Sequence, residues 1–385
     1  GTDHVKYFRS KASQTAIARA LQSRTDAIPG FEPLEAADIA EANRNAALPF
    51  VVSEVKMNRE VSGKKPIAII MPGIMGSNLY RDDERIWVDF WRFVKGDLLQ
   101  LDMNTPNITA PSLMGSGYRK LARHLTEGGY DVIAYAYDWR QDLSQVALDL
   151  NALIGELLPN GQPIHVLAHS MGGVLFREFM ILGDKWKDLN AAPGFRALFL
   201  GCPLGGSYLI PETLVGRGGN ITKLSLLDLK HGKKELLEVF GACPGLYNLL
   251  PLSTTPHDFG NIESWRTLLR YSNGLGIEPS DTILKNFRKF RDRINSSLGR
   301  DDFRNIIYVA GHSDSTTATY AIESDARGGN LVFKSTAEGD GSVTWASGIL
   351  PVFAENKALY YSTTIHGELA NDEKLFPAFR DLLKT

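Results

Sequence analysis

Residues 164–173 read IHVLAHSMGG, and this segment is the strongest indication of the fold in the sequence. An apolar, β-rich run leads into a small-x-Ser-x-Gly pattern centred on Ser170, and a helix-like stretch follows over 174–179. This is the strand, turn and helix context of a nucleophile elbow, where small residues beside the serine avoid clashes in a tight turn. Ala168 and Gly172 are the small residues here. Ser-Gly pairs also mark ordinary turns, so the other parts of an acyl-transfer site must be sought elsewhere in the chain.

The surrounding segments predict strands that alternate with helices. Helical patterns are found over 118–127 and around 148–157. Strand-like apolar runs, counting the one before Ser170, occupy 67–71, 130–137, 164–169, 197–200, 305–310 and 358–361. Alternation of this kind predicts an α/β fold with a mostly parallel sheet and helices on both faces.

Composition limits the function. The chain has 385 residues, 43% of them hydrophobic, and a formal net charge of −2, which is typical of a globular domain with a sizeable core. We expect no nucleic-acid partner because no strongly basic stretch is present, and no span of a bilayer because no apolar run approaches about 18 residues. The sequence specifies no oligomeric state.

Motifs for bound groups and for targeting are lacking in the sequence. The two cysteines, Cys202 and Cys243, exclude a disulfide framework and favour a reducing compartment. No cysteine or histidine cluster has metal-ligand spacing and no nucleotide-binding motif is found, so we expect neither a metal nor a cofactor. Since the chain shows no charged-then-apolar leader, we expect a cytoplasmic or membrane-peripheral location.

The chain divides at about residue 60. Residues 1–60 are predicted to be an N-terminal helical extension, and 61–385 an α/β domain with insertions at about 77–115 and 207–300. The insertions carry apolar residues: Trp87, Phe90, Trp91 and Phe93 in the first; Leu224, Leu226, Leu227, Leu236 and Leu237 in the second. The leucine set either forms a lid against a membrane or acyl chain or packs on its own core, and for this set we favour packing.

Backbone donors for an oxyanion are expected in a glycine-rich turn after the first strand. Residues 72–77 read PGIMGS. In an acyl-transfer site such a loop supplies one N–H donor, and the residue after the nucleophile supplies the other. We therefore assign these roles to the backbones of Ile74 and Met171, with an ordinary glycine turn as the alternative for the loop.

The acid and the base of a triad follow the nucleophile in chain order. Asp340 lies in a tight glycine turn after a strand-like run, and His366 is the only histidine beyond it. We assign Asp340 as the acid and His366 as the base. His312 and Asp314 form a rival pair on a loop, which we interpret as structural or close to the substrate. His169 is expected to pack or hydrogen-bond beside the serine.

Several motifs together resemble the lecithin:cholesterol acyltransferase-like family, which includes lysosomal phospholipase A2 and phospholipid:diacylglycerol acyltransferase. The resemblance covers roughly residues 64–372 and depends most on the YDWR segment. The chain resembles bacterial-type members of the family. The matching segments, together with the late His366, are MPGIMGS (71–77), IWVD (86–89), YDWR (137–140), AHSMGG (168–173), FGACPGLYNLLP (240–251) and GDGSV (339–343).

The resemblance implies an α/β-hydrolase fold with a cap and acyl-ester chemistry on lipids. It places the triad on Ser170, Asp340 and His366, and the oxyanion donors on Ile74 and Met171. Gly73 and Trp87 are candidate substrate-binding residues, with a core or cap aromatic as the alternative for Trp87. Asp138 and Arg140 are expected to form a scaffold ion pair. The cysteine-closed lid of the secreted animal members has no counterpart, because Cys202 and Cys243 lie elsewhere.

The sequence thus predicts a serine hydrolase or acyltransferase that cleaves acyl esters of lipids by a phospholipase A-type activity. Its partner would be a lipid substrate, with the membrane surface as a further contact. Three alternatives remain open: a triacylglycerol lipase, esterase or polyester depolymerase; an inactive lipid-binding module; and the lipase effector domain of a longer signalling or toxin protein.

Overall fold

The computed structural model of the chain describes residues 54–57, 60–87, 97–217, 231–272, 275–296, 298–324 and 328–384. Contacts divide the chain into two units, Gly1–Val52 and Ser53–Thr385, and every described residue belongs to the second. The helical extension expected over 1–60 therefore lies almost entirely outside the described residues. Its end is an exception, because Glu54–Lys56 forms strand β1.

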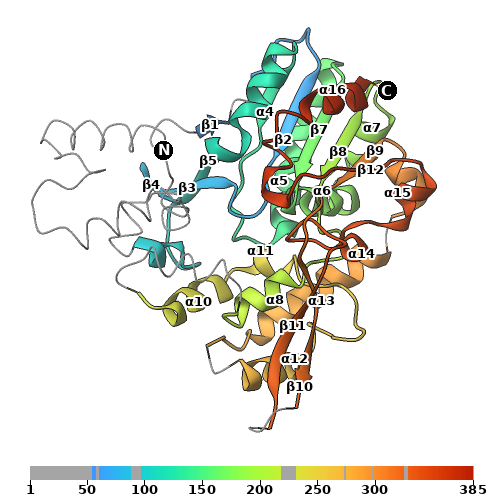
Figure 1. Cartoon of the computed structure of the whole chain (residues 1–385). Helices are drawn as coiled ribbons and strands as arrows, with labels where there is room; N and C mark the ends of the chain where they lie inside the picture. The colour runs from blue at the N-terminus through green and yellow to red at the C-terminus, as the bar shows by residue number, and fades with distance from the viewer. Residues whose placement is uncertain are drawn as a thin grey trace, which may run out of the picture. The chain divides into compact units, whose positions relative to one another are not determined.

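A six-stranded sheet forms the centre of this second unit (Figure 1). Its order is β12-β9-β8-β7-β2-β6, and every neighbouring pair is parallel. The strands, all close to their predicted ranges, are β2 (Ile67–Met71), β6 (Asp131–Ala134), β7 (Ile164–His169), β8 (Arg196–Leu200), β9 (Ile306–Ala310) and β12 (Leu359–Tyr361). The fold is that of an α/β-hydrolase, as predicted. Because β7 lies between β2 and β8, the loops that follow these three strands meet at one edge of the sheet.

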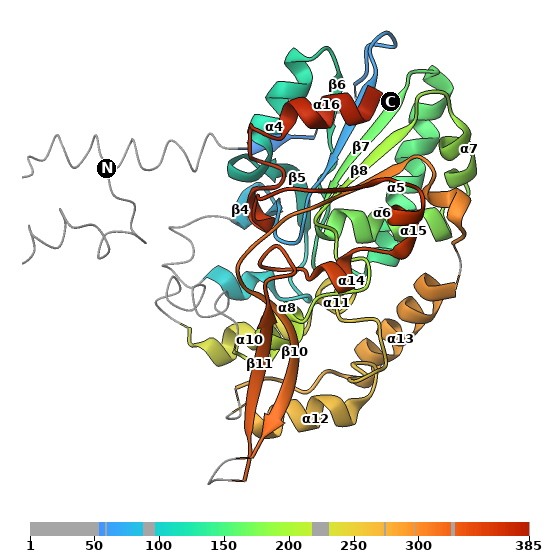
Figure 2. The same ribbon diagram turned by 45° about the vertical axis from the view of Figure 1, so that its right-hand side comes forward.

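Both faces of the sheet are covered, which explains the unbroken apolar run of β2. Ile67, Ile69 and Met71 belong to the core on the side of α5 (Leu143–Leu157) and α6 (Met171–Leu182). Ala68 and Ile70 belong to the core on the side of α4 (Gly115–Glu127) and α16 (Phe376–Lys384). A strand buried on both faces needs apolar side chains at every position, not at alternate ones. Figure 2 shows α4 and α16 on one side of β7 and β8, with α5 and α6 on the other.

The first predicted insertion supplies three strands of a small antiparallel sheet: β3 (Ser77–Arg81), β4 (Glu84–Trp87) and β5 (Ile108–Met114). The strand order is β1-β5-β3-β4, so the edge strand β1 joins it from outside the insertion. A 3₁₀ helix, η2, covers Asp97–Leu101. Phe90, Trp91 and Phe93, which we assigned to this insertion, lie outside the described residues.

The second predicted insertion is helical where it is described. It contains α8 (Leu209–Leu214), α10 (Lys233–Gly241), α11 (Pro244–Tyr247), α12 (Ile262–Tyr271) and α13 (Asp281–Ser296). Leu236 and Leu237 are fully buried in α10, so these two leucines pack in the core. Leu224, Leu226 and Leu227 lie outside the described residues.

A hairpin that the sequence did not predict separates β9 from Asp340. Strands β10 (Thr316–Glu323) and β11 (Asn330–Thr336) pair with each other in a two-stranded sheet of their own. The run Leu331–Phe333, read as a strand before the acid, therefore lies in this hairpin and outside the six-stranded sheet. The hairpin extends away from the central sheet alongside α12 in both ribbon views (Figures 1 and 2). Helices α7 (Trp186–Ala191), α14 (Trp345–Gly348) and α15 (Pro351–Glu355) complete the unit, with 3₁₀ helices η3 (Leu158–Asn160), η4 (Arg300–Phe303) and η5 (His366–Glu368).

Candidate active site

Ser170 occupies a sharp turn between the last residue of β7 and the first residue of α6. Its backbone has φ 53° and ψ −121°, a conformation that a residue with a side chain seldom adopts. Its N–H donates to the carbonyl of Leu200 at the end of β8 (2.9 Å). A Cβ added to Gly172 would lie 2.7 Å from the carbonyl oxygen of Met71, so only glycine fits there. The turn thus has the strained geometry and close packing of a nucleophile elbow.

The structure brings Ser170, His366 and Asp340 into one hydrogen-bonded series. His366 Nε2 lies 2.9 Å from Ser170 Oγ, and His366 Nδ1 lies 2.8 Å from Asp340 Oδ2. Ser170 and Asp340 are 5% and 2% exposed. A carboxylate only accepts hydrogen bonds, so Nδ1 carries the proton and Nε2 accepts from the serine hydroxyl. Three residues separated by as many as 196 positions thus lie in the geometry that a nucleophile, a base and an acid require.

Asp340 is held as a carboxylate by its surroundings. Burial on its own would raise the pKa of Asp340, but the adjacent His366 imidazole and hydrogen bonds from backbone N–H groups outweigh it and lower the pKa below the usual value. The N–H groups of Ser342 and Val343 donate to Asp340 Oδ1 at 3.0 and 2.8 Å. The second oxygen, Oδ2, therefore remains for His366.

Two backbone N–H groups close to Ser170 in the chain or in the fold have no described acceptor. A Cβ added to Gly73 would lie 2.9 Å from Ser170 Cβ and 3.3 Å from Ser170 Oγ, so the loop after β2 touches the serine. Within the described ranges, no hydrogen-bond acceptor is found for the N–H of Ile74 or of Met171. These are the two N–H groups that we assigned to the oxyanion, and both remain available for a ligand.

Three buried aromatic side chains hold the backbone of this loop. Tyr137 Oη donates to the carbonyl of Pro72 (2.8 Å), and Trp87 Nε1 donates to the carbonyl of Met75 (2.9 Å). The N–H of Gly73 donates to the oxygen of Tyr118 (2.8 Å). Two of these bonds hold the Pro72–Gly73 peptide, and the third holds the Met75–Gly76 peptide. The Gly73–Ile74 peptide lies between them, and its carbonyl accepts from the N–H of Gly76 (3.0 Å), so the free N–H of Ile74 is pre-oriented.

Trp87 lies behind this loop. It is 4% exposed, and its ring makes an edge contact with Trp139 (centroids 5.6 Å apart). Its substrate-binding role remains a proposal, and what the structure shows is packing and a bond to the loop. Tyr118 and Tyr137 were not identified as site residues from sequence. Tyr137 lies in the YDWR segment, whereas Tyr118 carries no motif.

The rest of the YDWR segment supports the scaffold. Arg140 Nη2 and Nε donate to the carboxylate of Asp138 at 2.6 and 2.9 Å, and Arg140 Nη1 donates to the carbonyls of Leu101 and Asp102. Arg140 is 1% exposed. The predicted scaffold ion pair is thus present. Of the four bonds, two lie within the YDWR segment and two connect it to the carbonyls of Leu101 and Asp102.

Neither His312 nor Asp314, the rival pair, has a described contact with Ser170. His312 packs against Trp345 (ring centroids 6.1 Å apart), and His366 occupies the position beside Ser170. Sequence reasoning missed Gly201, at the end of β8, where φ is +59° and an added Cβ would lie 2.8 Å from Asp340 Oδ2. A glycine directly after a buried strand is the signal that points to such a close approach.

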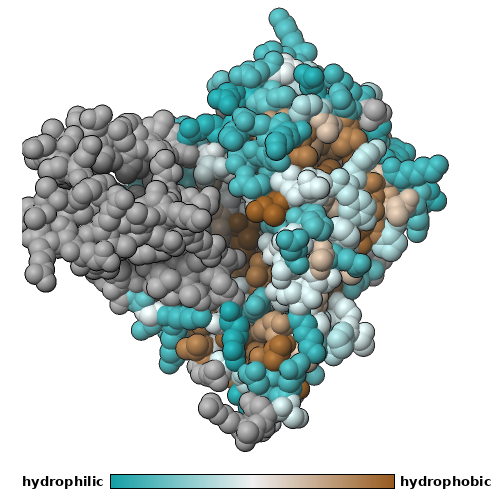
Figure 3. All heavy atoms as spheres, in the orientation of Figure 1, coloured by the Kyte–Doolittle hydropathy of each residue, from teal (hydrophilic) through white to brown (hydrophobic). Residues whose placement is uncertain are grey.

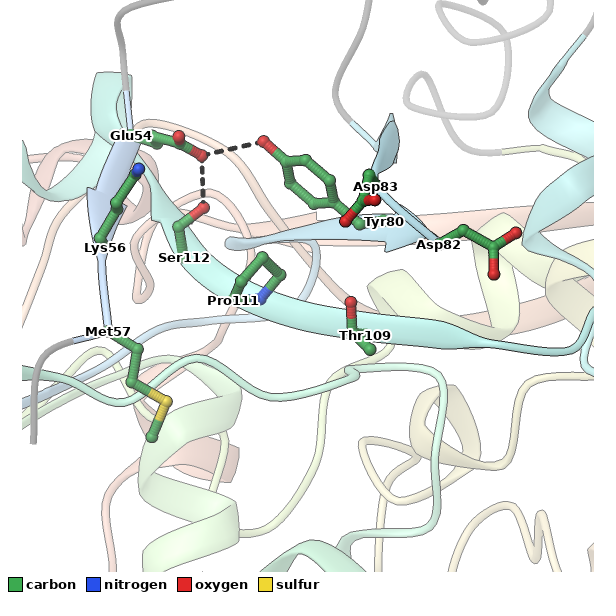
Figure 4. Close-up of a pocket in the computed structure, with 9 residues that line it drawn as sticks. All are labelled: Glu54, Lys56, Met57, Tyr80, Asp82, Asp83, Thr109, Pro111 and Ser112. Atoms are coloured by element: carbon green, nitrogen blue, oxygen red, sulfur yellow. Dashed lines mark hydrogen bonds between the residues drawn. The ribbon is translucent and has the colours of Figure 1, made fainter.

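Other kinds of site find little support. In the described part of the chain, no group of three or more His, Cys, Asp or Glu side chains is placed to hold a metal ion. Nor does that part contain a helix with the length and apolar character needed to cross a bilayer. A surface pocket between β1, β3 and β5, where Glu54 accepts hydrogen bonds from Tyr80 and Ser112 (Figure 4), contains none of the candidate site residues.

Comparison with known proteins finds one similar family. The sequence profile described as lecithin:cholesterol acyltransferase matches residues 107–281, which include Ser170 and Met171. The match covers less than half of the chain, and it supports a member of a lecithin:cholesterol acyltransferase-like family. Together with the site geometry, it supports a serine acyl-ester hydrolase or acyltransferase that acts on lipid esters.

Solved structures similar to this chain include a complex and a lipase. The Tle4–Tli4 complex is 15% identical and superimposes with a TM-score of 0.57, over 83% of this chain and 98% of that one. The mature lipase BlEst2 from Bacillus licheniformis is also 15% identical, over 85% of this chain and 95% of that one, with a TM-score of 0.42. No curated protein sequence matches the chain.

Proposed function

We propose that this protein removes fatty acyl groups from phospholipids in a phospholipase A-type reaction, through an acyl-enzyme on Ser170. The observation that carries the proposal is the unbroken series from Ser170 Oγ through the His366 ring to Asp340, at 2.9 and 2.8 Å. The unpaired N–H groups of Ile74 and Met171 supply the remaining part of an acyl-transfer site.

The chemistry follows from these contacts. His366 Nε2 takes the proton of Ser170 as Oγ attacks the ester carbonyl, and Asp340 stabilises the imidazolium. The N–H groups of Ile74 and Met171 bind the oxyanion. The alkoxide of the alcohol product leaves with the proton from His366, and the acyl group remains on Oγ. Water or an acceptor alcohol then gives its proton to His366 and takes up the acyl group.

A phospholipid is the favoured substrate because the family is named for a reaction on lecithin, which is a phospholipid. An apolar rim beside the base supports contact with a lipid surface, since Ile365 and Tyr361 are 53% and 57% exposed. Figure 3 shows apolar residues reaching the surface in several small patches. We assign the cap to residues 77–115 and 207–300, the N-terminal extension to 1–60, and substrate contacts to Gly73 and Trp87.

Product analysis tests this proposal. Mixed phospholipid vesicles are incubated with the wild-type protein, and lysophospholipids and free fatty acids are measured by mass spectrometry. We expect both products from the wild type and none from Ser170→Ala. Ser272→Ala removes another buried serine hydroxyl, far from the site at the end of α12, and should keep full activity.

The substrate panel separates the alternatives. Hydrolysis of triacylglycerol, short esters or polyester, with no release of acyl chains from phospholipids, would overturn the phospholipase assignment and support a lipase, esterase or depolymerase. Addition of a long-chain alcohol to the phospholipid assay separates hydrolysis from transfer, because transfer yields a new ester at the expense of free fatty acid. Equal activity in Ser170→Ala would overturn the mechanism itself.

A further inference from the structure

A chain of hydrogen bonds connects the oxyanion loop to the backbone of His366 through two side chains that the mechanism does not use. The N–H of Gly73 donates to Tyr118 Oη (2.8 Å), and Tyr118 Oη lies 2.9 Å from His169 Nδ1. On the other edge of the ring, His169 Nε2 lies 2.9 Å from the carbonyl oxygen of His366. The chain links the loop after β2 to η5 through α4 and β7.

The direction of every bond in this chain is determined. A carbonyl oxygen only accepts, so His169 Nε2 must carry the proton that it shares with His366. Nδ1 of the neutral ring is then an acceptor, and Tyr118 must donate its hydroxyl proton to it. This leaves the tyrosine oxygen to accept from Gly73. With a neutral His169 ring, each group in the chain has a single role as donor or acceptor in each contact.

The histidine in the chain stays neutral and buried. His169 is 8% exposed and Tyr118 is 4% exposed. Burial, together with the electrostatic effect of the neighbouring His366 imidazole, lowers the pKa of His169 to about 3. The charged or titratable groups that face it are Tyr118, His366 and, more weakly, Asp340. The rings of Tyr118 and His366 also pack on the ring of His169. Their centroids lie 5.9 and 5.1 Å from the His169 centroid.

We propose that Tyr118 and His169 are positioning residues, which set the oxyanion loop and the His366 imidazole relative to each other. The inference rests on the proposed function, because it concerns the same reaction. Tyr118 restrains the peptide that precedes Ile74, and His169 restrains the backbone that carries His366. A small misplacement of either donor or base costs catalysis far more than it costs folding.

Tyr118→Phe tests this proposal, with Tyr130→Phe as the matched control. Tyr130 is 6% exposed, and its ring packs on His165, which lies in β7 as His169 does (centroids 5.4 Å apart). Tyr130 has no described contact with the site residues. Kinetics on a soluble short-chain ester, the rate of fluorophosphonate labelling and the melting temperature are measured for each. We expect Tyr118→Phe to lower kcat and the labelling rate at least about tenfold with KM changed less than about twofold, because a buried donor and a buried acceptor lose their partner. Tyr130→Phe should leave both rates unchanged.

A pair of substitutions at His169 gives a second measurement that does not depend on the folding of Tyr118→Phe. His169→Gln places an amide N–H near the position of Nε2, toward the His366 carbonyl, whereas His169→Asn does not reach it. We expect His169→Gln to retain at least about tenfold more activity than His169→Asn. Combined with Tyr118→Phe, His169→Asn should lower kcat by much less than the product of the two single effects, since both act through one chain.

The outcomes separate the two proposals. A wild-type protein that neither labels nor hydrolyses esters would overturn the proposed function. If the wild type is reactive, two results would overturn the positioning role alone. One is a Tyr118→Phe variant that reacts at the wild-type rate, and the other is equal activity in His169→Gln and His169→Asn. A lower melting temperature with unchanged kcat would show that Tyr118 is only structural.

Discussion

Replacement of Gly73 by alanine is expected to disable the reaction while leaving the fold intact. The new Cβ would lie 2.9 Å from Ser170 Cβ, whereas two such carbons normally approach to about 3.5 Å at closest. The loop must therefore retreat by roughly 0.6 Å, and Ile74, the next residue, moves with it. Gly73 does not have a positive φ, so the effect is steric.

The magnitude follows from the oxyanion donor that this shift misplaces. Loss of one such donor lowers kcat by about 10²–10³, or about 3–4 kcal/mol, and overpacking reduces the free energy of unfolding by about 1–3 kcal/mol. The assay is kcat on a soluble ester, alongside unfolding in urea. Gly117→Ala is the control, because nothing lies within 4 Å of its added Cβ in helix α4. A Gly73→Ala protein with kcat within about threefold of the wild type would show that the added Cβ does not displace the Ile74 N–H.

Three further predictions concern the surroundings of the site. Arg293→Met should lower the free energy of unfolding by about 3–5 kcal/mol in urea, because the fully buried carboxylate of Glu178 loses its guanidinium partner; an unchanged midpoint would contradict this. Trp87→Phe should lower kcat by about fivefold to tenfold, since the carbonyl of Met75 loses a hydrogen bond; wild-type kcat would show that the bond does not position the loop. Burial lowers the pKa of His169 to about 3 and of His165 to about 4, below the usual 6.5. The unfolded chain therefore binds protons that the folded protein does not, and stability should fall below pH 6.5 by up to about 1.4 kcal/mol per histidine per pH unit. His165→Gln should flatten this dependence, and a wild-type stability equal at pH 7.5 and 5.5 would be inconsistent with it.

Features that depend on local pattern could be predicted from the sequence. The apolar runs of β2, β7 and β9 are buried on both faces, so their composition alone indicates parallel strands. The elbow could be predicted because its small residues are needed within a few positions of Ser170. Chain order then singled out Asp340 and His366, which the structure places in contact.

Features that depend on distant contacts could not be predicted. Tyr118 meets Gly73 across 45 positions, and nothing in its neighbourhood in the sequence marks its hydroxyl for that contact. Leu331–Phe333 has the composition of a strand, but composition does not tell which partner a strand joins, and here it pairs within a hairpin. Gly201 is required because Asp340 and His366 approach it, which only the folded chain reveals.

The site of covalent labelling tests most directly whether Ser170 is the nucleophile and His366 its base. The wild-type protein is treated with a fluorophosphonate, digested and analysed by tandem mass spectrometry, in parallel with His366→Ala. We predict one adduct, on Ser170, and labelling of His366→Ala slower by at least about 10³-fold, because the imidazole activates the hydroxyl. An adduct on another residue would contradict the assignment of Ser170 as the nucleophile. Labelling of Ser170 at the wild-type rate in His366→Ala would contradict the assignment of His366 as the base.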